Sequence, residues 1–241
     1  MKRLLLLAAF LQVLILSCTV NQEMDLNVDS SGTVSMKIEL HPIFREYLLD
    51  ISDILDGDAD QQNIFDVERI KAAVAARNGL RLINVNTPET DVLEMSVKFD
   101  NVENIITSQE AENTEDVLAL SMAGGVNTLD FHLTAGNFRS VLAIAALDDS
   151  PLVDTFGPCE EDPWDEEEYL DTVSYALEEN GTVPEIREMF QNASIKITVN
   201  VKGTIVSQKG GKISGKKVLF DIPLLRVLTL EDPLDLQIKY K

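Results

Sequence analysis

Apolar and polar residues alternate in two short runs near the start of the chain, separated by the turn-forming residues 29–32. A two-residue period places alternate side chains on opposite faces of an extended strand. The two runs therefore predict a β-hairpin with one buried face. The apolar positions of the hairpin are Met24, Leu26, Val28, Val34, Met36, Ile38 and Leu40.

The apolar spacing changes from two residues to three or four after Pro42. Proline cannot continue a strand ladder, but it suits the first turn of a helix. We therefore expect an amphipathic helix over residues 42–55, with one apolar face against the sheet. The apolar positions are Ile43, Phe44, Tyr47, Leu48, Ile51, Ile54 and Leu55.

Along the rest of the chain, segments with a two-residue apolar period alternate with segments whose apolar residues are three or four apart. Strands are expected near 80–86, 91–99, 118–122, 129–133, 195–201, 218–222 and 234–240. Helices are expected near 64–78, 101–111, 137–147 and 165–180, with a short one opening at Pro184. This order predicts a single α+β domain, residues 23–241, in which one antiparallel β-sheet carries helices packed on one face.

The amino terminus has the three parts of a bacterial lipoprotein signal. Lys2 and Arg3 precede 13 residues, 4–16, that are apolar except for one glutamine. Such a run is too short to span a bilayer but suits a signal peptide. Ile15-Leu16-Ser17-Cys18 follows, and places a branched apolar residue, a small residue and a cysteine where a lipobox requires them.

We therefore expect residues 1–17 to be a signal peptide, Cys18 to be lipidated and 18–22 to form a short tether. A diacylglyceryl group with an added N-acyl chain such as palmitate supplies the two or more chains that stable anchoring needs. The expected location is the bacterial cell envelope, on a membrane, facing the periplasm or the exterior. The alternative is an ordinary cleaved signal peptide with a chance cysteine. With Cys18 lipidated, Cys159 would have no disulfide partner.

The formal net charge of −21 argues against nucleic acid as a partner, because phosphate-binding surfaces need clustered Lys and Arg. An acidic, proline-containing segment at about 148–168 is expected to be an exposed insertion. It could bind a basic protein or divalent cations, or it could simply be a solvated surface. Its candidate partner-binding residues are Glu160, Glu161, Asp162, Trp164, Asp165, Glu166, Glu167 and Glu168.

We expect no metal, no cofactor and no catalytic activity. His41 and His132 are the two histidines of the chain, and neither has a Cys, Asp or Glu beside it at metal-ligand spacing. His41 is expected to cap the helix at Pro42, and His132 to point to solvent from an alternating strand. No nucleophile-elbow, P-loop or dinucleotide-binding glycine pattern occurs.

Two stretches at the ends of the domain resemble a known family. The first reads DLNVDSSGTVSMKIELHPIF and the second SIKITVNVKGTIVSQKGGKISGKKVLFDIPLLRVLTLEDPLDLQIKY. Their order of strand, glycine turn, strand, hydrophobic loop and strand resembles the LppM-type lipoprotein domain of bacterial envelopes. The resemblance is carried mainly by residues 24–44 and 194–240, and the acidic segment departs from it.

That resemblance implies an antiparallel sheet packed by helices, in a shape likened to lipid- or ligand-binding folds, with no known catalytic role. The function expected from the sequence is therefore a lipid-anchored envelope protein that binds a lipid or another apolar ligand. The alternative is a surface or periplasmic interaction protein that uses its acidic segment.

Overall fold

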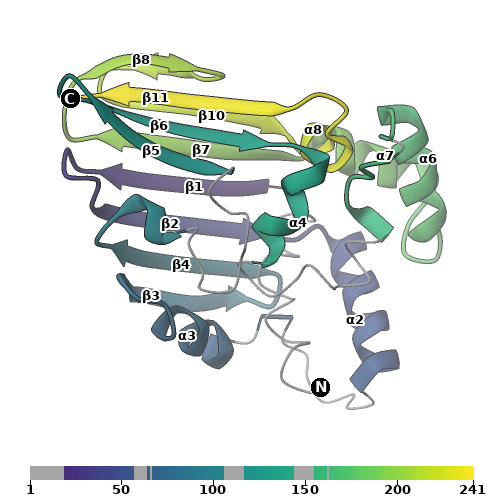
Figure 1. Cartoon of the computed structure of the whole chain (residues 1–241). Helices are drawn as coiled ribbons and strands as arrows, with labels where there is room; N and C mark the ends of the chain where they lie inside the picture. Colours follow the sequence, from purple (N-terminus) through teal and green to yellow (C-terminus); the bar gives the residue numbers. More distant parts are fainter. Residues whose placement is uncertain (1–18, 57–63, 66, 106–116, 144–154, 162) are drawn as a thin grey trace.

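The computed structural model describes residues 19–56, 64–65, 67–105, 117–143, 155–161 and 163–241, which form one α+β domain (Figure 1). The strands are β1 (Thr19–Leu26), β2 (Gly32–Glu39), β3 (Leu80–Glu89), β4 (Val92–Phe99), β5 (Leu118–Ala123), β6 (Val126–Leu133), β7 (Ser194–Val201), β8 (Ile205–Lys209), β9 (Lys212–Ser214), β10 (Lys217–Pro223) and β11 (Leu234–Tyr240). The helices are α2 (Pro42–Asp56), α3 (Val67–Ala75), the 3₁₀ helix η1 (Val102–Ile105), α4 (Ala135–Ala143), α6 (Glu166–Ala176), α7 (Val183–Asn192) and α8 (Leu224–Thr229).

The strands form two sheets, where the sequence predicted one. The larger sheet has the order β3-β4-β2-β1-β7-β10-β9, and the smaller has the order β5-β6-β11-β8. All pairings are antiparallel except that of β1 with β7. Parallel neighbours need a long connection, and residues 27–193 supply it. The α+β class and the single domain are confirmed, whereas the single antiparallel sheet is not.

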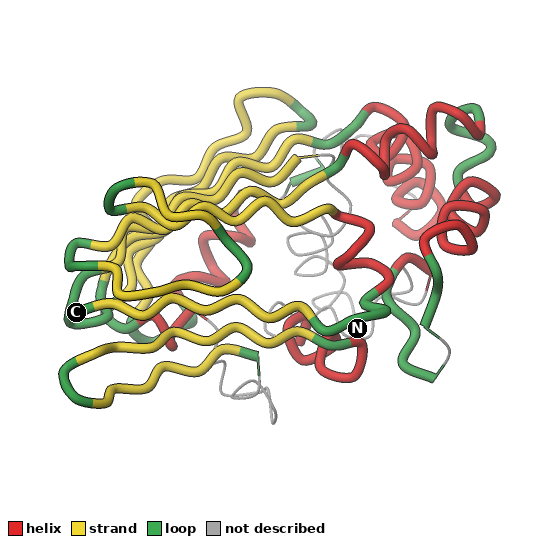
Figure 2. Tube along the Cα trace, turned by 90° about the horizontal axis from the view of Figure 1, so that it is seen from above, coloured by secondary structure: helices red, strands yellow, loops and turns green. Residues whose placement is uncertain are grey.

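The two sheets lie in separate layers, and one stretch of chain belongs to both (Figure 2). Strand β8 pairs with β11 in the smaller sheet, and β9, three residues further along, pairs with β10 in the larger sheet. Gly210 and Gly211 make this crossing, and Gly210 has a φ of +83°. A Cβ at Gly210 would lie 2.7 Å from Leu236 Cδ2 and 2.9 Å from the Asp235 carbonyl oxygen. The crossing therefore requires a residue without a side chain.

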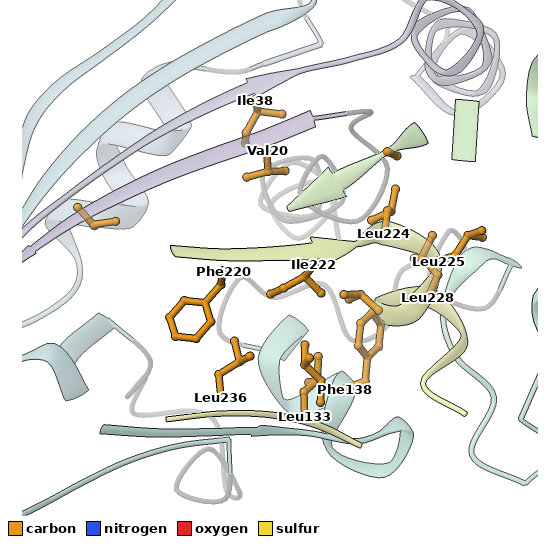
Figure 3. Packing of buried hydrophobic residues seen from close by; sticks show 14 of the residues in the cluster. Val20, Ile38, Leu133, Phe138, Phe220, Ile222, Leu224, Leu225, Leu228 and Leu236 are labelled. Atoms are coloured by element: carbon orange, nitrogen blue, oxygen red, sulfur yellow. The ribbon is translucent and has the colours of Figure 1, made fainter. Parts of the chain in front are cut away.

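The core lies between the apolar faces of the sheets. The register places Val20, Ile38 and Ile195 in one row, and their outward neighbours are polar. Figure 3 shows Phe220 and Ile222 of β10 with Leu236 of β11, and α4 and α8 closing the same core. Each such side chain stabilises the fold by about 1.5–3 kcal/mol when it is fully removed from water.

The helices do not all cover one face, which differs from the prediction. Helices α2, α6, α7 and α8 lie beyond one end of the strands (Figure 1). Helix α8 was not predicted, because its six residues are almost all buried and its apolar run has no helical period to read. Within the described segments, no helix is long and apolar enough to cross a bilayer.

Strand β1 begins at Thr19, which corrects the predicted tether. Thr19 pairs with Glu39 on one side and with Ser194 on the other. Residues 19–22 are therefore part of the larger sheet, because the alternation that starts the hairpin extends further back than the sequence pattern indicated. Cys18 and the predicted signal peptide lie outside the described residues.

Candidate functional site

On the inner face of the larger sheet, the centres of β1 and β2 are less well covered than their ends. At the ends, Val20, Leu26 and Ile38 are 0–1% exposed. Met24 and Met36 share the same face, nearer the strand centres, and are only half-buried. Tight packing between two sheets would cover the centres at least as well as the ends. The inner faces therefore present an apolar surface that the described residues do not fully cover.

We call the half-buried apolar residues of the inner faces the mid-strand apolar surface; they come from both sheets, and Leu118 and Ile195 extend the surface to the starts of β5 and β7. Its half-buried members are Met24, Met36, Leu118, Leu120, Phe131, Ile195 and Ile197. Gln22 pairs with Met36 and Ile197 in the same row and adds one amide group. Methionine is flexible and polarisable, so it adapts to ligands of irregular shape. Chemically, such a surface can hold an alkyl chain and give one hydrogen bond to a polar group on it.

The opposite face of the larger sheet is polar. A groove of about 380 Å³ crosses it, and Glu23, Lys37, Glu94 and Lys196 are among the charged side chains that line it. Many of the polar groups on this face already have partners. Ser35 and Ser96 share a hydrogen bond of 2.8 Å, and the Glu23 carboxylate accepts from Asn200 at 2.8 Å. We interpret this face as a solvated polar surface.

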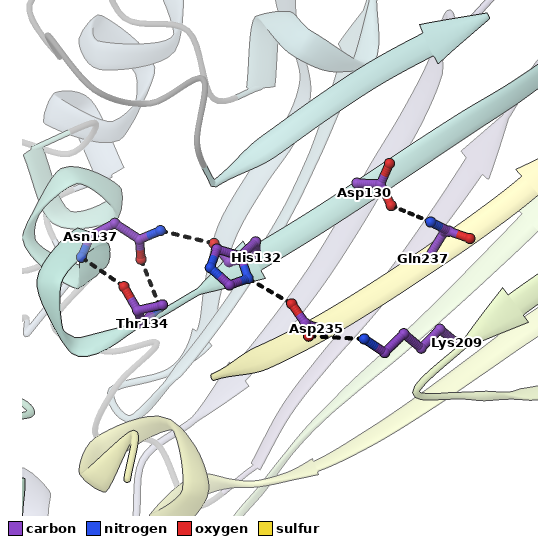
Figure 4. Close-up of polar contacts among 7 residues, drawn as sticks. All are labelled: Asp130, His132, Thr134, Asn137, Lys209, Asp235 and Gln237. Atoms are coloured by element: carbon purple, nitrogen blue, oxygen red, sulfur yellow. Dashed lines mark hydrogen bonds and ion pairs between the residues drawn. The ribbon is translucent and has the colours of Figure 1, made fainter. Parts of the chain in front are cut away.

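His132 has an acidic partner that the sequence pattern did not reveal. Its Nδ1 lies 2.6 Å from Asp235 Oδ1, and Lys209 Nζ donates to the other carboxylate oxygen at 2.9 Å (Figure 4). The hydrogen bonds from His132 and Lys209 lower the pKa of Asp235. His132 is exposed, as expected. The pairing was missed because the two residues are 103 positions apart and no local pattern joins them.

His41 lies immediately before α2, as predicted for a cap. The backbone N–H of Ile43 donates to His41 Nδ1 at 3.4 Å. Burial lowers the pKa of His41, and the nearby Glu185 carboxylate partly offsets that effect. Within the described residues, no group of three or more His, Cys, Asp or Glu gathers as metal ligands would.

A second pocket, which we call the edge pocket, lies where the chain crosses between the sheets. Its volume is about 240 Å³. The end of β8, the ends of β10 and β11 that face it and helix α8 enclose it. The lining residues are Lys209, Gly210, Asp221, Ile222, Arg226, Pro233, Leu234, Asp235 and Leu236. No local sequence pattern predicts this pocket, because its lining residues come from four separate elements.

Part of the acidic segment is docked on the domain. Phe156 is fully buried and packs edge-to-face on Phe44 and Tyr47, with ring centroids 5.9 and 5.5 Å apart. The Tyr169 hydroxyl donates to the Phe156 carbonyl at 2.9 Å. Phe156 thus ties this part of the segment to α2 and α6, and the expected exposed loop is wrong at this residue, whereas Glu160 and Glu161 are exposed.

Several predicted partner-binding residues have structural contacts. Asp165 caps α6 by accepting from the Glu168 N–H at 2.8 Å, and Glu167 pairs with Arg187 at 2.8 Å. Trp164 is half-buried against the core. Exposed carboxylates remain at Glu160, Glu161, Glu166 and Glu168, whereas Asp162 lies outside the described residues. Cys159 is a half-buried free cysteine.

Comparison with known proteins gives one distant likeness. No protein-family model matches the chain, and no curated protein matches it. Among solved structures, the NMR structure of the folded domain of LppM from Mycobacterium tuberculosis matches with a TM-score of 0.41 and 9% sequence identity. The match covers 92% of this chain and 88% of that one.

Proposed function

We propose that this chain is a lipid-anchored protein of the bacterial cell envelope that binds a lipid or another apolar ligand without catalysis. The anchor is supported by the lipobox Ile15-Leu16-Ser17-Cys18. The ligand is supported by the half-buried mid-strand apolar surface, which is the single observation that carries this function. An alkyl chain laid on that surface would gain about 0.8 kcal/mol for each buried CH₂ group.

The ligand proposal is tested with the full chain extracted from membranes and examined by native mass spectrometry. The chain is expected to carry an apolar ligand, and the double variant M24Q/M36Q is expected to retain at least about fivefold less, because a buried amide without a partner costs about 1–3 kcal/mol. Met122→Gln is the matched control, because Met122 is 72% exposed. A chain that carries no ligand, or equal retention by all three proteins, would refute the proposal.

The anchor is tested separately by the intact mass of the membrane-extracted protein. We expect the mass of residues 18–241 plus a diacylglyceryl group and an N-acyl chain, and we expect Cys18→Ser to lose both the added mass and membrane attachment. A mass equal to unmodified residues 18–241 contradicts lipidation.

We also propose, as a second candidate, that the acidic segment binds a basic protein. It is supported by the exposed carboxylates of Glu160, Glu161, Glu166 and Glu168. Converting these four to glutamine is expected to abolish salt-sensitive binding of a lysine-rich peptide, because the attraction between exposed charges is screened by salt. The doubly neutralised variant E231Q/D232N, exposed elsewhere, is the control. Unchanged peptide binding by the fourfold variant would exclude this surface.

A further inference from the structure

The edge pocket exists because two strands end their pairing early. Strand β9 pairs with β10 only over Lys217–Leu219, and β8 pairs with β11 only from Gln237 onward. The edges of β10 at Asp221 and Ile222 and of β11 at residues 234–236 are therefore unpaired on this side. Both edges line the pocket, so backbone donors and acceptors are available to a ligand there.

Two opposite charges line this pocket without pairing to each other. Arg226 and Asp221 are both exposed, and in the part of the chain that the structure describes neither side chain has an ion-pair or hydrogen-bond partner. The other two charges are engaged, since Lys209 and Asp235 bind one another at 2.9 Å. The pocket thus offers one free guanidinium and one free carboxylate.

The surroundings of the pocket also tolerate an anion, although the whole chain is acidic. Residues 194–241 contain nine Lys or Arg and four Asp or Glu, against a net charge of −21 for the chain. All the residues that line the edge pocket come from this basic part. A negatively charged group can therefore approach here without the repulsion expected elsewhere.

We propose that the edge pocket binds a small zwitterion, with its phosphate or carboxylate at Arg226 and its ammonium group at Asp221. A guanidinium binds two oxygens of such an anion through parallel N–H bonds, and a carboxylate accepts from an ammonium. A volume of about 240 Å³ admits a ligand the size of an amino acid or of phosphoethanolamine and excludes a folded partner.

The position of the pocket indicates one source of this zwitterion. Pro223 of β10 pairs with Ser194 of β7, and Ser194 pairs with Thr19 of β1. With strands about 4.8 Å apart, the pocket lies on the order of 10 Å across the sheet from the residue that follows Cys18. If the proposed lipid anchor is correct, the zwitterionic headgroup of a membrane lipid lies within reach. A free small zwitterion is the other source.

Calorimetry on the full chain in detergent tests the chemistry independently of the anchor and of the apolar ligand. Phosphoethanolamine is expected to bind at least about tenfold more tightly than inorganic phosphate or ethanolamine alone, because charge-assisted bonds form at both ends. Asp221→Asn is expected to bind phosphate and phosphoethanolamine with equal affinity, because the partner of the ammonium group has been removed. Arg226→Gln is expected to bind neither anion. The loss of preference for phosphoethanolamine in Asp221→Asn cannot result from unfolding, because an unfolded variant would lose the binding of phosphate as well.

The controls are Arg81→Gln and Asp100→Asn, exposed charges on the other side of the larger sheet, which should bind like the original chain. Equal affinity for all three probes, or an unchanged preference in Asp221→Asn, would overturn the proposal. Nanodiscs of phosphatidylethanolamine and of phosphatidylglycerol then separate the two sources. If phosphatidylethanolamine nanodiscs alone protect Arg226 from modification by phenylglyoxal, the ligand is the lipid headgroup. If neither kind of nanodisc protects Arg226, the ligand is the free zwitterion.

Discussion

At the residue scale, Gly210 is the position where a side chain would do most damage to the crossing between sheets. Its φ of +83° lies in the left-handed region, which costs other residues about 1–2 kcal/mol. The space is also closed by Leu236 and by the Asp235 carbonyl. The left-handed conformation and the close contacts would each lower the stability of a variant with a side chain at this position, and the two effects can be measured separately.

Gly210→Ala is expected to lower the free energy of unfolding by about 2–4 kcal/mol, because overpacking adds to the left-handed strain. Gly125→Ala is the matched control, since Gly125 has a φ of +76° and no heavy atom within 4 Å of an added Cβ. The control should lose about 1–2 kcal/mol. Chemical denaturation followed by circular dichroism measures both, and equal losses would show that the contacts at Gly210 do not matter.

At the scale of elements, the bonds at Asp235 join β6, β11 and β8 across the outer face of the smaller sheet. These side-chain bonds lie on the exposed face of the smaller sheet, so they add to the backbone hydrogen bonds that already join the three strands. They also make this sheet sensitive to acid, because the lowered pKa of Asp235 means that the folded state binds its proton less readily than the unfolded chain does.

The stability from Asp235 should be fully present above its ordinary pKa of 3.8 and should be lost as the pH falls through the lower value in the folded protein. Asp235→Asn is therefore expected to make the unfolding free energy depend less on pH in that acidic range. Denaturation at a series of pH values checks this, with Asp100→Asn as an exposed control. An acid limb of the same slope in Asp235→Asn would contradict it.

The predicted elements agreed best where the local pattern was long and regular. The hairpin of β1 and β2 and helix α2 were found from periodicity because each has one apolar face with many repeats. The 101–111 helix is confirmed only as the short η1, since residues 106–116 are outside the described part. Helix α8 was missed because burial on all sides removes the polar positions from which a period is read.

At the scale of the whole molecule, β1 holds the centre of the larger sheet. It pairs with β2 on one side and with β7 on the other, so it joins strands that are about 160 residues apart in the chain. Such contacts between distant parts of the chain cost the most entropy to form, and they are lost together when the strand that joins them is removed.

A chain without residues 1–26 is therefore expected not to fold cooperatively, because β2 and β7 would face each other without the central strand. A chain without residues 1–18 is expected to keep its unfolding transition. Thermal and urea denaturation of both chains measures this. A cooperative transition in the shorter chain would show that β1 is dispensable.

The sequence by itself determined the α+β class and most strands and helices, and it predicts a targeting signal, because these depend on short segments and their periodicity. Only the tertiary structure decided that there are two sheets, that β1 and β7 run parallel, and that Thr19 already belongs to the sheet. It also decided which charges pair, as His132 does with Asp235 and Lys209 does with Asp235. Those pairings join residues from separate elements, and the pairing of strands fixes them over distances that no local pattern records.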